Sequence, residues 1–171
     1  MSTTVRIAGI VRESIVDGPG FRFVVFTQGC PHHCEGCHNP ESHDPFGGYD
    51  CEIDKIVSEV EKNPLLSGVT FSGGEPFCQV KPLIELAKKV IHLGKNLIIY
   101  TGYQMETLLK MGEDQPEILE LIGLADIIVD GPFILQQRDL NLLFRGSLNQ
   151  RVIDAKQTLK QKKIVETTFA Q

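Results

Sequence analysis

The sequence lacks any long run of apolar residues. Its longest apolar stretches, such as residues 97–100, are far shorter than the about 20 residues that a helix needs to cross a bilayer. The first thirty residues also lack the sustained apolar segment of a secretory signal peptide. We therefore expect a cytoplasmic protein that neither spans nor binds a membrane.

An excess of positive charge is also missing. The chain has 17 Lys and Arg residues against 22 Asp and Glu residues, which gives a net charge of -5 and a pI near 5.5. A chain of this kind has no broad basic surface with which to attract nucleic acid or anionic lipid. We expect its partners to be a protein or small molecules, with no nucleic acid among them.

Internal repeats, low-complexity tracts and linker-like segments are absent as well. The 171 residues are 42% hydrophobic and 23% charged, which is the composition of an ordinary globular protein. Nothing in the sequence divides the chain, so we expect one domain that spans residues 1–171.

Patterns typical of strands alternate along the chain with patterns typical of helices. We expect strands at 21–26, 68–71, 96–100 and 126–129, and helices at 53–60, 83–91, 105–111 and 116–121. This alternation predicts an α/β fold with a parallel sheet, whose ligands gather at the carboxyl ends of the strands. A complete (β/α)8 barrel takes about 250 residues, so we expect an incomplete TIM-like βα barrel or an open sheet.

Three of the five cysteines lie within eight residues, directly after the first predicted strand. Cys30, Cys34 and Cys37 have C-x3-C-x2-C spacing, and free thiols in a reducing compartment favour metal binding or catalysis. Three thiolates could hold a [4Fe–4S] cluster and leave one iron open to an outside ligand. The same loop also fits zinc, and Cys34-x-x-Cys37-His38 matches c-type haem attachment, although no export signal accompanies it.

The segments around this loop carry a more specific resemblance. Residues 17–22 read Asp-Gly-Pro-Gly-Phe-Arg, and Phe-Thr-Gln-Gly leads into Cys30. With these segments the chain resembles the radical S-adenosylmethionine superfamily, and within it the activating enzymes of glycyl-radical enzymes. Segments 100–103, 129–133 and 144–151 are most similar to the activating proteins of anaerobic ribonucleoside-triphosphate reductases.

The resemblance implies a function, cofactors and partners. A [4Fe–4S] cluster on the three cysteines would cleave S-adenosylmethionine reductively, and the resulting radical would convert a glycine on the large subunit of the anaerobic ribonucleotide reductase into a glycyl radical. A low-potential donor such as flavodoxin would supply the electron. Three alternatives stay open: an activase of another glycyl-radical enzyme of the pyruvate formate-lyase type, a small-molecule radical enzyme, and a zinc-binding interaction module.

A glycine-rich motif after the second predicted strand supplies an independent indication. Gly73 and Gly74 lack side chains, so their backbone can lie against a ligand, and the carboxylate of Glu75 can accept hydrogen bonds from an ammonium group. The resemblance assigns this motif to the methionyl amine of S-adenosylmethionine. Taken alone, such a motif is more often an ordinary turn.

Three more residues are candidates for the site. The resemblance implies that Asp130 and Thr101, each at a strand end, help bind the cofactor, although turn formation and capping explain such residues equally well. Asp17 could position a cation or shape the entrance for the substrate glycine, besides forming its turn. We expect that Cys51 and Cys78 do not bind the cluster, and that the loop histidines are solvated or packed against it.

Overall fold

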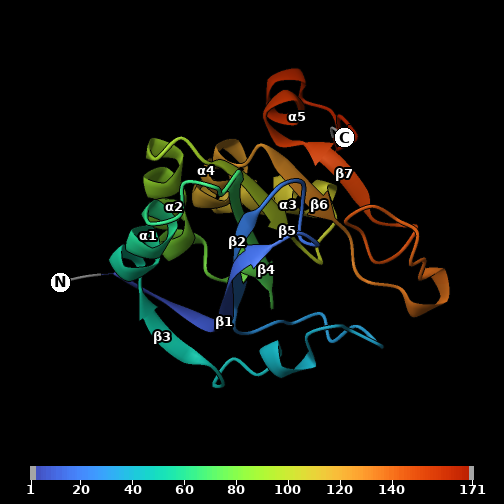
Figure 1. Cartoon of the computed structure of the whole chain (residues 1–171). Helices are drawn as coiled ribbons and strands as arrows, with labels where there is room; N and C mark the ends of the chain where they lie inside the picture. Colours follow the sequence, from blue (N-terminus) through green and yellow to red (C-terminus); the bar gives the residue numbers. More distant parts are fainter. Residues whose placement is uncertain (1–2, 170–171) are drawn as a thin grey trace.

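The computed structural model describes residues 3–169, in which seven strands form one mixed sheet (Figure 1). Across the sheet the order is β3-β1-β2-β4-β5-β6-β7. The strands β2, β4, β5 and β6 are parallel to one another, whereas β1, β3 and β7 pair antiparallel. The bounds are β1 (Thr4–Ser14), β2 (Arg22–Thr27), β3 (Tyr49–Glu52), β4 (Gly68–Gly73), β5 (Asn96–Tyr100), β6 (Ile127–Asp130) and β7 (Arg151–Asp154).

The four parallel strands are the four that the sequence predicts, while the three antiparallel strands are not predicted. The strand β1 shifts register between Ile7 and Gly9, and most of its second half is exposed, so no clean alternation marks it. In β3 no residue is fully buried, and β7 has only four residues. A short or half-exposed edge strand leaves little apolar pattern in a sequence.

The helices lie beside one another along one side of the sheet (Figure 1). The bounds are α1 (Ile53–Glu61), α2 (Val80–His92), α3 (Met105–Asp114), α4 (Pro116–Leu124) and α5 (Ala155–Gln161). The first four confirm the predicted helices, whereas α5 is not predicted. Asp154 caps the N-terminus of this short helix, because its side chain accepts a hydrogen bond from the Gln157 N–H.

Alternate side chains of the central strands form the core with these helices. The strand residues share a position on the helix-covered face and are almost fully buried: Phe23, Val25, Val69, Phe71, Leu97 and Ile99. Successive side chains of a strand point to opposite faces, so the helices take every second residue. The intervening residues of these strands point to the opposite face of the sheet, and the candidate site lies on that face.

On that opposite face the C-terminal segment returns along β7. The N–H of Asp154 donates to the Val165 carbonyl, and the N–H of Thr167 donates to the Val152 carbonyl, both at 2.8 Å. Phe169 is only 6% exposed and packs edge-on against Phe144, with ring centroids 5.0 Å apart. The chain therefore covers part of this face with its own tail.

A buried arginine occupies the other end of the same face. Arg22 is 0% exposed and donates from Nε to the Thr70 hydroxyl at 2.7 Å and from Nη2 to the Val69 carbonyl at 2.8 Å. Burial lowers the pKa of Arg22 to about 10, although the nearby acidic groups of Tyr100, Asp126 and Asp17 act to raise it. The Thr70 hydroxyl in turn donates to the Asp17 carbonyl, which fixes the turn before β2.

The α/β class is therefore confirmed, with a parallel centre and antiparallel edges that the sequence does not predict. The strand pairings leave β3 and β7 at the two ends of the sheet, and the incomplete barrel stays a prediction. Within residues 3–169, every helix is too short or too polar to cross a membrane.

Candidate functional site

Loops at the carboxyl ends of the four parallel strands surround one cleft of about 780 Å³. This is where an open α/β sheet usually binds its ligands. The loop that follows β2 contributes three thiols, and the ends of β4, β5 and β6 contribute small residues. The cleft-lining residues from these four loops include Cys30, Cys34, Cys37, Gly73, Gly74, Thr101 and Gly131.

The cysteine loop is closed at its base by backbone hydrogen bonds. The N–H of Gly29 donates to the Ser42 carbonyl at 2.7 Å, and the N–H of Cys30 donates to the His43 carbonyl at 3.1 Å. All three thiols are half-buried and free of disulfides. Burial raises the pKa of the Cys30 thiol, and backbone N–H groups at His32 and His33 oppose this by hydrogen bonding to the sulfur.

This donor set fits an iron–sulfur cluster. Within residues 3–169, no three His, Cys, Asp or Glu side chains converge as the ligands of a single metal ion would. The three thiols instead line one open cleft, and thiolates are the ligands that iron–sulfur clusters take. The ligation itself stays a prediction.

The two glycines allow β4 to end directly against the start of the cysteine loop. A Cβ on Gly73, whose φ is +88°, would lie 2.6 Å from the Phe26 Cα, and one on Gly74 would lie 2.4 Å from the Gly29 carbonyl oxygen. The N–H of Gly74 donates to the Thr27 carbonyl at 2.7 Å. Glycine is therefore required here for close packing as well as for any approach of a ligand.

Glu75 lies behind the cleft wall and outside the cleft lining. Its side chain is 0% exposed, and its carboxylate accepts from the Phe77 N–H at 3.0 Å and the Gly102 N–H at 2.8 Å. The Thr101 hydroxyl also donates to it, and His32 Nε2 lies 2.7 Å from Oε1. The carboxylate thus joins three loops of the site, and its expected contact with an ammonium group stays a prediction.

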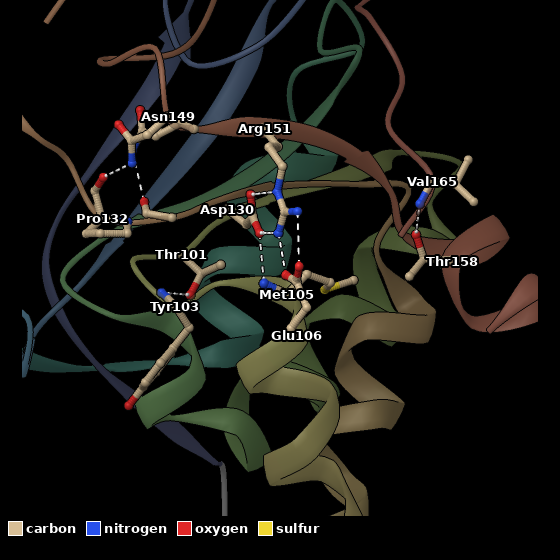
Figure 2. A network of polar contacts seen from close by, with 12 residues as sticks. Thr101, Tyr103, Met105, Glu106, Asp130, Pro132, Asn149, Arg151, Thr158 and Val165 are labelled. Carbon is tan, nitrogen blue, oxygen red and sulfur yellow. Dashed lines mark hydrogen bonds and ion pairs between the residues drawn. The ribbon is translucent and has the colours of Figure 1, made fainter. Parts of the chain in front are cut away.

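The structure separates the two strand-end residues, Thr101 and Asp130. Thr101 lines the cleft, and its hydroxyl accepts from the Tyr103 N–H at 3.1 Å. Asp130 is 1% exposed and does not line the cleft. Its carboxylate accepts from the Met105 N–H at 2.8 Å and from Arg151 Nε at 3.1 Å and Nη2 at 2.6 Å (Figure 2). The contacts of Asp130 are therefore those of a structural carboxylate.

Asp17 lines the cleft from the turn between β1 and β2. Its carboxylate accepts from the Ser14 hydroxyl at 2.5 Å, and the following Gly18 has a φ of +133°. Asp17 therefore lies both in the turn and at the cleft, and its role toward a cation or the substrate glycine stays a prediction. Neither Cys51 nor Cys78 lines the cleft.

Comparison with known proteins identifies the family to which this chain belongs. Residues 16–153 match the family model described as a 4Fe-4S single cluster domain. The anaerobic ribonucleoside-triphosphate reductase-activating protein of Vibrio cholerae is 34% identical over 144 residues, which cover 80% of this chain and 89% of that protein. The protein of the same name from Escherichia coli K12 is 32% identical over 148 residues, which cover 81% of this chain and 91% of that protein. This chain belongs to the radical S-adenosylmethionine activases.

Two further comparisons are more partial. The pyruvate formate-lyase-activating enzyme of Clostridium pasteurianum is 38% identical over 104 residues, which cover 57% of this activase and 44% of that enzyme. A solved structure, QueE from Escherichia coli, covers 58% of the activase and 52% of its own chain at 16% identity and a TM-score of 0.44, a likeness too partial to support an argument.

The family decides between the metals that the cysteine spacing leaves open. A 4Fe-4S domain that spans residues 16–153 of the activase includes the whole cysteine loop, so iron–sulfur binding is favoured over zinc and over haem. The activase has an enzymatic role, as the names of its relatives indicate.

Sequence reasoning misses some residues of the site. It treats His32 as a solvated or cluster-packing side chain, whereas the structure bonds it to Glu75. It also overlooks the exposed apolar pair Ile15 and Val16, which are 67% and 71% exposed and line the cleft near Asp17. The contact between His32 and Glu75 joins residues 43 positions apart, which no local pattern indicates. Ile15 and Val16 directly precede Asp17, and this adjacency is the signal that could have found them.

Proposed function

We propose that the activase cleaves S-adenosylmethionine reductively and installs a glycyl radical on the large subunit of an anaerobic ribonucleoside-triphosphate reductase. One observation carries this proposal: the three thiols of the cysteine loop and the glycine pair after β4 line the same cleft. A cofactor bound there would touch a cluster on one side and bare backbone on the other. The names of the relatives support the choice of partner.

Cys30, Cys34 and Cys37 would hold a [4Fe–4S] cluster with one iron free of protein ligands. A bound cluster would supply the electron for the reductive cleavage of S-adenosylmethionine into methionine and a 5′-deoxyadenosyl radical, which would take a hydrogen atom from the glycine Cα. The electron would come from a low-potential donor such as flavodoxin.

The residues of the chain orient the cofactor and exclude water. Gly73 and Gly74 would lie against the methionine half, and Thr101 would contact the cofactor from the end of β5. The aromatic rings of Phe26, Phe133 and Phe144 line the same cleft. An apolar lining excludes water from the reaction.

The partner would enter where the cleft is open to solvent. Ile15 and Val16 are exposed at the cleft and would be covered by the glycine-bearing loop of the reductase, while Asp17 would help position that loop. We regard residues 1–171 as one radical S-adenosylmethionine domain, built as an incomplete βα barrel that the partner covers.

Product analysis tests the reaction. Anaerobically reconstituted and reduced protein should convert S-adenosylmethionine into equal amounts of 5′-deoxyadenosine and methionine. The C34A variant serves as the control and should form neither. Wild-type protein that holds a full cluster but releases no 5′-deoxyadenosine would contradict the proposal.

A second candidate is an activase of the pyruvate formate-lyase type, because such an enzyme is 38% identical over 104 residues of this chain. Spin resonance separates the two. Each candidate partner is incubated with the reduced activase and S-adenosylmethionine, and a glycyl doublet should appear on the reductase. A doublet on the lyase alone would favour the second function.

A further inference from the structure

His32 belongs to the cysteine loop, yet its side chain is fixed on the opposite side of the site. Its Nε2 lies 2.7 Å from Oε1 of Glu75, and 15% of the side chain is exposed. Its ring packs edge-on against Tyr103, with centroids 4.6 Å apart. A Cβ on Gly102 would lie 2.4 Å from the His32 ring, so the glycine makes room for it. The neighbouring His33 is exposed instead.

The surroundings of Glu75 determine the direction of this hydrogen bond. The buried carboxylate accepts from the N–H groups of Phe77 and Gly102 and from the Thr101 hydroxyl. A carboxylate that accepts from these three donors is placed to accept from the imidazole as well, which then donates through Nε2. A buried carboxylate that loses a donor is destabilised, and the segments that it joins lose their common anchor.

His32 lies between two proposed cluster ligands along the chain, two residues from Cys30 and two from Cys34. The N–H of Cys30 donates to the His43 carbonyl at 3.1 Å, which fixes the base of the loop. The hydrogen bond between the His32 side chain and Glu75 fixes the stretch between the two cysteines. His32 thus joins this loop to a carboxylate that also accepts from the loops after β4 and β5.

We propose that His32 is a positioning residue that anchors the cysteine loop on Glu75 and so keeps Cys30 and Cys34 in the arrangement that holds the cluster. The inference rests on the proposed function in one respect, that a cluster is held by Cys30, Cys34 and Cys37. Without the anchor, the loop would lose its register on Glu75, and the cluster would be held less firmly.

Three variants distinguish the contribution of the His32 hydrogen bond from that of its aromatic ring. H32F keeps an aromatic ring beside Tyr103 but has no donor, H32Q keeps a donor without the ring, and H33Q changes the exposed neighbour as a matched control. Each protein is reconstituted anaerobically, and its iron and sulfide are counted. The rate of cluster loss to a chelator, measured without S-adenosylmethionine, is the second readout.

We expect H32F to lose its cluster several-fold faster, while H32Q and H33Q stay close to the wild type. Loss of loading in H32F alone would also support the proposal. An H32F protein with wild-type loading and cluster loss, or equal damage in H32F and H32Q, would overturn it.

Two controls keep the outcomes separate. Wild-type protein that binds no iron would contradict the proposed function, whereas a loaded wild type with an unaffected H32F variant contradicts only this inference. Circular dichroism of the apo proteins reports folding. If H32F does not fold, E75Q, which weakens the same hydrogen bond, replaces it under the same expectations.

Discussion

Replacing Asp130 with alanine tests whether this carboxylate supports the fold or binds the cofactor. The structure places Asp130 at 1% exposure between the first turn of α3 and β7, where it accepts from the Met105 N–H and twice from Arg151 (Figure 2). D130A removes all three hydrogen bonds. It leaves the Met105 N–H without its partner, because the first N–H groups of a helix have none within the helix.

The expected cost follows from which groups lose a partner. Hydrogen bonds to a charged group contribute about 1.5–3 kcal/mol each. Arg151 keeps Glu106 on its other side and is 26% exposed, so its guanidinium is not left unpaired. We therefore expect D130A to lower the free energy of unfolding by about 3 kcal/mol, which corresponds to a melting temperature lower by about 6–12 °C at this chain length.

The matched control removes the exposed partner of the same guanidinium. Glu106 is 58% exposed, so E106Q should cost less than about 1 kcal/mol. Hydrogen bonding to Arg151 holds the pKa of Glu106 below its ordinary value. The contribution of the pair is therefore complete above the pKa of the unfolded state and is lost as the pH falls through the lowered value, where E106Q and the wild type should converge.

Thermal unfolding of the apo proteins and binding of S-adenosylmethionine to the reconstituted proteins are the two assays. D130A should melt earlier and, below its melting temperature, bind the cofactor as the wild type does. A D130A protein of unchanged melting temperature that binds S-adenosylmethionine much more weakly would refute this reasoning and restore the ligand role that the sequence suggests.

Three further predictions follow from other parts of the structure. C34A should lose the brown colour and the iron of the reconstituted protein, whereas C51S, which changes a thiol outside the cleft, should keep both, as iron analysis will show. F169A should lower the free energy of unfolding by about 3 kcal/mol in denaturant titrations, because the ring is almost fully buried. G74A should lower cluster loading per chain, since the new Cβ would lie 2.4 Å from the Gly29 carbonyl oxygen.

The sequence predicts the centre of the fold because the centre has the strongest pattern. The strands β2, β4, β5 and β6 are short apolar runs, and α2 has apolar residues at helical spacing between Pro82 and Gly94. The edge strands of the sheet are not predicted because their apolar pattern is weak. The strand β7 pairs antiparallel with β6 and is flanked by the returning C-terminal segment, and no local pattern indicates either contact.

The candidate site divides in the same way. The spacing of Cys30, Cys34 and Cys37 is local, and the structure places all three on the cleft. The role of an acidic residue depends on what the fold brings to it. Glu75 receives His32 from another loop, and Asp130 receives Arg151 from β7, so both carboxylates lie behind the cleft wall. Sequence reasoning identifies such residues without finding their partners.

The central claim is that three thiols hold a [4Fe–4S] cluster whose open iron receives S-adenosylmethionine. The most direct measurement is the spin-resonance spectrum of the anaerobically purified, reduced protein, recorded before and after addition of S-adenosylmethionine. We predict a reduced-cluster signal that changes shape when S-adenosylmethionine is added and that is missing in C34A. A colourless protein with stoichiometric zinc, or a cluster signal that S-adenosylmethionine leaves unchanged, would contradict the account.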